Sequence, residues 1–338
     1  MGKKVMLFLG NGFSIDMMKQ LGNSEKICLS NLFSEGMNVP WPETNKPGFL
    51  SYQYCPNLWT LGARPYINEE SALSIIENVI TCANILPQRL GFKNKIYIKA
   101  YNELEQYLMS LFVYYTNMVK IRSKKNLNKI EKWGWTKFFK KLNSDSSVDK
   151  VFIVSLNYDI WLEQLFEEWG IEYTMDGLSS TSIKKKFIIY KPHGSIAFHS
   201  VKRDKSAYAI PYSETFDNHK IDEFSYDLNN LDCLNLVNAL IPPAGDSTRM
   251  KFAWSVKIKK DIMNQAKKMT KDDVAILCGL SYWHVDRSEI DDYLSYLPMD
   301  IKDVIMVNPN PPEVLNAVLM TLFNQYNVYD SSDNLLRI

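Results

Sequence analysis

Short runs of apolar residues recur along the chain, and most of them end in glycine or in small polar residues. The runs cover residues 5–9, 151–154, 187–190, 274–279 and 303–308. Uninterrupted apolar runs of this length are typical of strands that are covered on both faces, as in a parallel sheet. Helical spacing lies between the runs, at residues 15–20, 160–169, 254–269, 286–294 and 312–323. This alternation predicts an α/β fold, a Rossmann-like parallel sheet with helices on both faces.

The pattern changes in the first half of the chain. Residues 22–68 are rich in proline, glycine and asparagine, yet they are too aromatic for simple disorder. We predict that this segment is ordered, either as a lid over a ligand or as ordinary packing. Residues 69–141 have helical spacing, and we expect helices at 71–85, 97–122 and 130–142.

These patterns divide the chain into three parts. A Rossmann-like domain is expected from residues 1–20 and 150–325 together. An irregular and mainly helical insertion is expected over residues 22–145. The C-terminal tail, residues 326–338, carries no element that the pattern predicts.

The charges of the chain nearly cancel. Lys and Arg number 39 against 38 Asp and Glu, which gives a net charge of +1. Bulk attraction therefore gives no reason to expect direct nucleic-acid binding. The segment 120–141 is basic and contains Trp133 and Trp135, which leaves a nucleic-acid or acidic-partner surface open, but a solvated helix face is the favoured interpretation.

Composition narrows the class of protein further. The apolar content of 46% is ample for a core. The five cysteines form no C-x-x-C pair, which argues against a zinc ribbon or a thioredoxin-like site. The apolar run before Gly10 is too short for a secretory signal, and no segment approaches the roughly 18 uncharged apolar residues of a membrane helix. We expect a cytoplasmic protein without a membrane part.

The first apolar run leads into Gly10, Asn11, Gly12, Phe13 and Ser14. Glycines after a buried strand let the backbone approach a ligand, and the first amides of a following helix point at an anion. This stretch predicts a nucleotide phosphate site. Two glycines alone are weak evidence and favour an ordinary tight turn, since the full dinucleotide fingerprint needs more.

Polar residues also follow the other strands. Asn157 and Asp159 follow the second, His193 follows the third, and Ser281 and Asn308 follow the last two. In an open α/β sheet the ligand site lies at the carboxyl ends of the strands, so we expect these side chains to share one rim. Each residue alone has a structural explanation: Asp159 as a helix cap, Asn157 as a turn residue and His193 as a buried structural histidine.

Five motifs in this order resemble those of the sirtuins, and in particular those of the divergent bacterial sirtuin-like NADases of anti-phage defence systems. The motifs are Gly-Asn-Gly-Phe-Ser at 10–14, Asn-Tyr-Asp at 157–159, His-Gly at 193–194, Gly-x-Ser-x-x-x-x-Asp at 279–286 and Val-Asn at 307–308. The similarity covers about residues 1–20 and 150–325. Leu156 replaces a sirtuin glutamine, and the four zinc cysteines of protein deacylases are absent.

The resemblance implies an NAD+ glycohydrolase that cleaves NAD+ to nicotinamide and ADP-ribose, with NAD+ as substrate and no zinc. It implies catalytic roles for three residues. Asn157 would place the ribose or the water, His193 would accept a proton, and Asp159 would order the loop or face the cation. Hydrolysis of this bond passes through an oxocarbenium-like state with a neutral leaving group, so no general acid is required. The glycine loop at 10–14 would hold the diphosphate. The phosphate and adenosine-ribose side would fall to Gly279, Ser281, Asp286 and Asn308.

The same resemblance implies an effector that depletes NAD+ during anti-phage defence and stays latent until a partner or ligand activates it. The expected partner is a protein of the same operon, a HerA-type ATPase or another subunit, and assembly with further copies of the chain is also expected. The alternative is a catalytically silent sensor of NAD or ADP-ribose, or a structural subunit of a defence complex. A protein deacylase ranks below both, because the zinc cysteines are missing.

Overall fold

The centre of the molecule is a sheet of seven parallel strands. The computed structural model describes residues 2–85, 95–178, 185–200, 209–212, 219–231, 234, 237–243, 252–283 and 286–338. The strands lie in the order β10-β9-β8-β1-β2-β4-β3. Their bounds are β1 Lys3–Leu9, β2 Val148–Ser155, β3 Tyr173–Met175, β4 Phe187–Tyr190, β8 Val274–Cys278, β9 Asp303–Val307 and β10 Tyr326–Tyr329. The predicted parallel sheet is confirmed.

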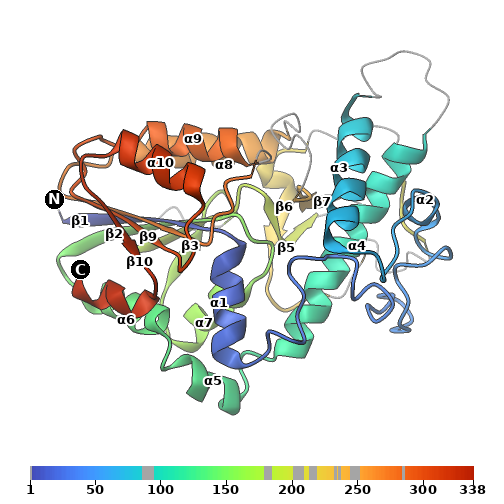
Figure 1. Ribbon diagram of the computed structural model, residues 1–338. Helices are drawn as coiled ribbons and strands as arrows, with labels where there is room; N and C mark the ends of the chain where they lie inside the picture. Colours follow the sequence, from blue (N-terminus) through green and yellow to red (C-terminus); the bar gives the residue numbers. More distant parts are fainter. Residues whose placement is uncertain are drawn as a thin grey trace.

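Helices cover both faces of this sheet (Figure 1). One face carries α1 Asn11–Leu21, α6 Gly134–Ser144 and α7 Trp161–Glu168, with α5 Lys124–Ile130 beside α1. The other carries α8 Ala253–Ala266, α9 Arg287–Ser295 and α10 Glu313–Leu322. The chain leaves β1 for β2 on one side and later returns to β8 on the other. The carboxyl ends of β1 and β8 therefore flank the topological switch point, where ligands bind in open α/β sheets.

Apolar side chains of the central strands and helices fill the space between these layers. Phe8 of β1 stacks on Tyr293 of α9, with ring centroids 6.0 Å apart. On the opposite face Phe13 of α1 packs against Trp133 and Trp135. Both tryptophans are buried, so they belong to the core and present no stacking surface to a nucleic acid.

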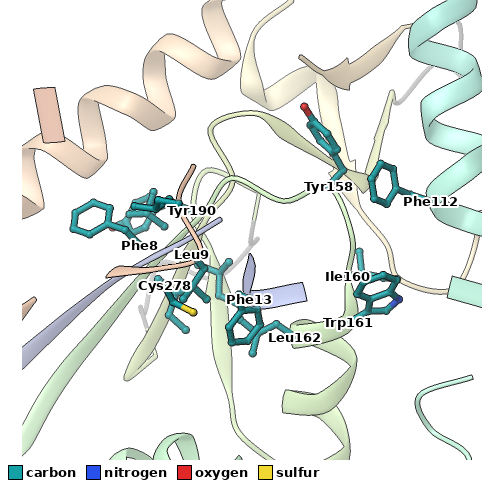
Figure 2. Packing of buried hydrophobic residues seen from close by; sticks show 14 of the residues in the cluster. Phe8, Leu9, Phe13, Phe112, Tyr158, Ile160, Trp161, Leu162, Tyr190 and Cys278 are labelled. Carbon is teal, nitrogen blue, oxygen red and sulfur yellow. The ribbon is translucent and has the colours of Figure 1, made fainter. Parts of the chain in front are cut away.

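The helical part of the insertion stands beside the carboxyl edge of the sheet (Figure 1). It contains α2 Pro56–Thr60, α3 Glu69–Ile85 and α4 Ile96–Val119. Phe112 of α4 faces Tyr158 in the loop after β2, with ring centroids 5.4 Å apart (Figure 2). This contact joins the insertion to the sheet at the strand ends.

The irregular segment before α3 is ordered by its aromatic residues, as predicted. Trp41 stacks on Tyr54 with ring centroids 4.3 Å apart, and Phe49 packs beside both. Two tyrosines of α4 bond its backbone: the Tyr107 hydroxyl donates to the Leu32 carbonyl, and the Tyr115 hydroxyl to the Cys28 carbonyl. The segment is thus fastened along α4.

A second sheet of three strands, in the order β6-β5-β7, was not predicted. Its strands are β5 Gly194–Ser200, β6 Phe224–Tyr226 and β7 Asn238–Leu240, with η2 Ile221–Glu223 before β6, and β5 pairs antiparallel with both neighbours. Two of the strands have only three residues, which is too short for an alternating pattern to stand out. The short β3 escaped prediction for the same reason.

Several predicted boundaries were wrong. Helix α1 begins at Asn11, earlier than residue 15, so most of the glycine loop is its first turn. The helix expected over residues 130–142 is α6, which begins only at Gly134, because Trp133 before it has extended backbone (φ −69°, ψ 136°). The short helix α5 that precedes it was not predicted.

The insertion and the tail are also less separate from the sheet than their patterns suggested. Helix α6 packs against α7, which covers one face of the sheet: the ring of Phe139 lies 5.1 Å from that of Phe166 in α7. The tail, residues 326–338, supplies the edge strand β10 and then η4 Ser332–Arg337, which packs against α6. Within the described ranges, no helix is both long enough and apolar enough to cross a membrane.

Candidate functional site

A cavity of about 380 Å³ lies at the carboxyl ends of β1, β2 and β8, at the switch point of the sheet. Its walls come from both parts of the molecule. The sheet edge and its loops contribute Gly10, Asn11, Leu156, Asn157, Tyr158, Asp159, His193, Pro243, Leu280, Ser281, Trp283, Asp286 and Ile290. The insertion contributes Leu29, Ser30, Leu32, Glu69, Leu73 and Phe112.

The glycines of two loops touch each other at the floor of this site. A Cβ on Gly12 would lie 2.5 Å from the Gly279 Cα, and one on Gly10 would lie 2.5 Å from the Gly279 carbonyl oxygen. Gly279 has φ +62°, a left-handed conformation that favours glycine. These glycines are therefore required for close backbone contact between the β1–α1 and β8–α9 loops.

The sequence predicts that the first amides of α1 bind a diphosphate, but two of these amides donate to backbone carbonyls instead. The Gly12 amide donates to the Gly279 carbonyl at 3.0 Å, and the Phe13 amide donates to the Gly10 carbonyl at 3.0 Å. Phe13 itself is a buried core residue. The first turn of α1 thus serves to fix the second loop and the side chains behind the cavity.

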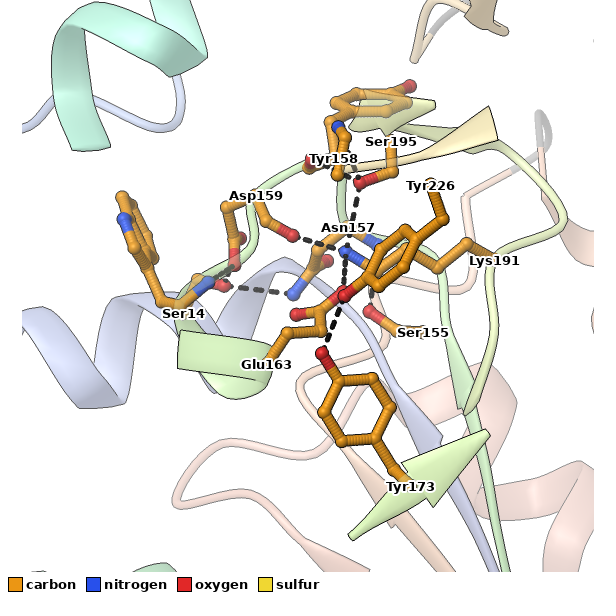
Figure 3. Close-up of polar contacts among 12 residues, drawn as sticks. Ser14, Ser155, Asn157, Tyr158, Asp159, Glu163, Tyr173, Lys191, Ser195 and Tyr226 are labelled. Carbon is orange, nitrogen blue, oxygen red and sulfur yellow. Dashed lines mark hydrogen bonds and ion pairs between the residues drawn. The ribbon is translucent and has the colours of Figure 1, made fainter. Parts of the chain in front are cut away.

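Asn157, Ser14 and Asp159 form a hydrogen-bonded network beside that turn (Figure 3). Asn157 Nδ2 donates to the Gly10 carbonyl at 3.0 Å and to Ser14 Oγ at 2.9 Å, and Ser14 Oγ donates to Asp159 Oδ2 at 2.7 Å. Both amide hydrogens of Asn157 are used in this way. The described residues provide no partner for its Oδ1, which leaves that acceptor for a ligand in the cavity.

Asp159 has a structural as well as a site role. Its Oδ1 accepts from the Trp161 amide at 3.3 Å, at the start of α7. Burial raises the pKa of Asp159, and the positive charge of Lys191 opposes that rise. The N-cap of α7 is Ile160, so the cap position expected for Asp159 was wrong by one residue. The Asp159 carboxyl group nevertheless bonds the first amide of α7 and lines the cavity.

Lys191 is buried and reaches the backbone of Asp159 from the far side of Asn157 (Figure 3). Its Nζ is 2.7 Å from Glu163 Oε1, and both side chains are 1% exposed. The same ammonium donates to the Asp159 carbonyl and approaches Ser195 Oγ at 3.5 Å. Burial raises the pKa of Glu163, and Lys191 opposes it. Lys191 therefore ties the β2–α7 loop to the turn that carries His193.

His193 is held between β4 and β5 with its ring at the cavity wall. The next residue, Gly194, has φ +87°, and a Cβ there would lie 1.8 Å from the Ala239 carbonyl oxygen. His193 Nε2 is 3.1 Å from Glu289 Oε2 and 4.0 Å from Asp286 Oδ1. Burial alone lowers the pKa of His193, but the carboxylates of Glu289 and Asp286 outweigh it, so the pKa lies above its ordinary value.

Most of the predicted site residues meet in the cavity, with some changes of place. The walls include Gly10, Asn11, Asn157, Asp159, His193, Ser281 and Asp286, while Gly12, Phe13, Ser14 and Gly279 lie directly behind them. Asp286 was expected on the phosphate and adenosine-ribose side, yet it lies beside His193.

Asn308 does not line the cavity. Its Oδ1 accepts from the Asn310 amide at 2.9 Å, a local turn contact. Its expected role toward the adenosine ribose stays a prediction.

Sequence reasoning missed several residues of the site. Glu289, Lys191 and Lys259 are distant in sequence from the groups that they contact, and nothing in their local sequence separates them from surface charges. For the apolar lining residues of the insertion, such as Phe112, the sequence predicts only that they lie on the apolar face of a helix, not that they line a cavity. The irregular segment before α3 is predicted to be either a lid or ordinary packing. Its Leu29 and Leu32 line the cavity, as the residues of a lid would.

Tyr282, which follows Ser281, has φ +50°, an unusual conformation for a bulky residue. Its hydroxyl donates to Asp291 Oδ1 at 2.5 Å, which holds the strained loop against α9. This loop carries Ser281 and Trp283 to the cavity wall. Strain of this kind is concentrated at functional sites.

The described part of the chain contains no group of three or more His, Cys, Asp or Glu side chains arranged to hold a metal ion. Comparison of the sequence with known protein families finds no matching family, and a search of curated proteins finds no similar sequence.

Proposed function

We propose that this protein is an NAD+ glycohydrolase, an enzyme that cleaves NAD+ with water into nicotinamide and ADP-ribose. The observation that carries the proposal is the meeting of Asn157 and His193 in one cavity at the switch point of a parallel sheet. These two residues lie 36 positions apart in sequence (193 − 157) and come from separate strand ends. Their convergence supports the family resemblance of the motifs that contain them.

In the proposed reaction a water oxygen attacks C1′ of the nicotinamide ribose. The C1′–N bond breaks, and its electron pair leaves with neutral nicotinamide. Asn157 Oδ1, free of partners among the described residues, accepts a hydrogen bond from a ribose hydroxyl or from the water. His193 accepts the proton that the water loses.

The charges of the cavity indicate how the substrate would lie. The acidic and basic lining residues that the structure describes are the carboxyl groups of Glu69, Asp159 and Asp286 and the imidazole of His193, with no Lys or Arg among them. Carboxylates favour the cationic nicotinamide ring and the developing oxocarbenium charge, and they disfavour a diphosphate. We therefore propose that the nicotinamide-ribose half enters the cavity and that the diphosphate remains at its mouth.

The test is nicotinamide release from NAD+ by the purified protein, alone and with the protein encoded by the neighbouring gene. Asn157→Ala and His193→Ala are each expected to lower the rate at least about 100-fold. Asn327→Ala on the exposed edge of β10 and His219→Ala outside the cavity are the matched controls. Unchanged NAD+ in both wild-type incubations, with a folded protein, would overturn the proposal, as would full activity of either cavity variant.

A silent sensor of NAD or ADP-ribose is the second candidate. It is favoured by Leu156, an apolar residue in the cavity wall where the sirtuins have glutamine. Calorimetric titration with ADP-ribose separates the two candidates. Tight binding without turnover, alone and with the neighbouring gene product, supports the sensor, whereas nicotinamide release supports the hydrolase.

A further inference from the structure

The ring of His193 is held from one side only. Its Nε2 faces Glu289 Oε2 at 3.1 Å, and the side chain, which is 5% exposed, lies at the cavity wall. The turn that carries it is fixed on both sides: Ser255 Oγ donates to the Pro192 carbonyl at 2.7 Å, and the Ile241 amide donates to the His193 carbonyl at 2.9 Å. Among the described residues no group bonds Nδ1, so this nitrogen remains for a ligand.

Glu289 is itself held at both oxygens. Oε1 accepts from the Tyr293 hydroxyl at 2.5 Å, and Oε2 is 2.6 Å from Lys259 Nζ in addition to His193. Glu289 is buried, yet it does not line the cavity. Burial raises its pKa, but His193 and Lys259 outweigh that effect and keep the pKa well below the ordinary range, so the group is a carboxylate. A fixed carboxylate accepts a hydrogen bond and cannot donate one.

We propose that Glu289 is a positioning residue, which orients His193 and holds a proton on Nε2 so that the Nδ1 lone pair faces the cavity as the base. This inference rests on the proposed hydrolase function. During the reaction the water O–H bond breaks and its proton moves to Nδ1, which makes an imidazolium. The carboxylate of Glu289 then stabilises that charge, as a third group does in nucleophile–histidine–acid triads. Tyr293 and Lys259 keep the carboxylate in place.

The pH dependence follows from all the charges that face His193. Glu289 approaches from α9, Asp286 from the N-cap of that helix, and Lys259 from α8. The two carboxylates raise the pKa of His193, whereas Lys259 lowers it. A base must be unprotonated, so activity rises with pH through this pKa. Loss of the Glu289 charge lowers the pKa and moves the rising limb of the profile to lower pH.

Two variants separate charge from orientation. Glu289→Gln keeps an acceptor for Nε2–H and removes the charge, so its rising limb should move to lower pH by about one unit while KM stays within about twofold. Glu289→Ala removes both, and kcat should fall about 100-fold. Glu223→Gln, outside the cavity, is the control that should match wild type. A Glu289→Gln profile identical to wild type would overturn the role of Glu289.

Nuclear magnetic resonance titration makes the test independent of turnover. The chain has four histidines, and the His193→Ala spectrum identifies the His193 signal in protein labelled on histidine. Wild type should show the Nε2–H tautomer and a pKa above that of Glu289→Gln. An equal pKa, or a mixed tautomer in wild type, contradicts the inference. The fixed tautomer without any nicotinamide release would overturn the hydrolase and leave the positioning role of Glu289 supported.

Discussion

At the scale of single residues, Lys191 shows how one buried charge holds two loops of the site. Its ammonium lies between Glu163 and the Asp159 carbonyl, in a region closed to water. Two carboxyl groups share this one cation, and both have raised pKa values because of burial. Removal of one partner from such a cluster leaves an uncompensated charge in the interior.

We therefore predict that Lys191→Met lowers the free energy of unfolding by about 3 to 5 kcal/mol at pH 8. Without Lys191 the folded-state pKa values of both acids rise further above their unfolded values. Stability is then fully present below the unfolded pKa and is lost as pH rises through the folded pKa, so the deficit should be much smaller at pH 5. Urea unfolding at the two pH values measures this difference.

The control is Lys185→Met, which removes an exposed pair with Glu172 (41% and 74% side-chain exposure) and should cost less than about 1 kcal/mol. A Lys191→Met deficit that matches this control, or that does not change with pH, would show that the cluster is not held by charge.

Residues of the site differ in how far sequence could predict them. Asn157, Asp159 and His193 each lie within five residues after an apolar run, so the rule for the carboxyl ends of strands was enough to group them. Glu289 reaches His193 from 96 positions away, on a helix whose other acids face solvent or other partners. Glu289 and His193 meet only because α9 packs on the sheet, so no local sequence pattern predicts their contact.

At the scale of elements, the contact between the β1–α1 and β8–α9 loops decides where the cavity floor lies. Gly279 and Gly170 have nearly the same backbone conformation, with φ +62° and +64°. They differ in their surroundings. A Cβ at Gly279 would lie 2.4 Å from the Gly12 Cα, whereas a Cβ at Gly170 would meet nothing within 4 Å.

This pair gives a matched prediction. Alanine at either position costs about 1 to 2 kcal/mol for the left-handed conformation. At Gly279 we expect a further loss of about 1 to 3 kcal/mol, because two backbone segments must move apart. Thermal unfolding of Gly279→Ala and Gly170→Ala measures the difference. Equal losses would mean that the two loops separate without resistance.

Elements were predictable where their patterns were long. The buried strands β1, β2, β8 and β9 and the helix α4 were found because several consecutive turns or residues repeat one pattern. The start of α6 at Gly134 was hidden, because Ile130 and Trp133 keep helical spacing with the apolar residues of α6, and the short α5 was not predicted. The strand β10 was hidden as an edge strand, whose Asn327 and Val328 are exposed.

At the scale of the whole molecule, the site exists only between the two parts of the chain. The sheet edge supplies most of the polar groups, and the insertion supplies Ser30, Glu69 and an apolar wall that includes Leu29, Leu73 and Phe112. Sequence could place the strand ends on one rim, because parallel strands share a direction. The sequence could not predict that α3 and α4 lie beside that rim, because the spacing of apolar residues does not indicate which edge of the sheet a helix covers.

Because both parts of the chain line the cavity, a bound ligand should slow hydrogen exchange in both of them. With ADP-ribose present, hydrogen exchange should slow at residues 28–33 and 69–73 of the insertion and at 156–159 of the sheet edge, because these segments line the cavity. Residues 326–338, which do not line the cavity, should exchange unchanged. Mass spectrometry of peptides from wild type and from Asn157→Ala provides the measurement, and the variant should lose most of the protection. Protection confined to 156–159 would mean that the ligand rests on the sheet alone and that the insertion does not act as its lid.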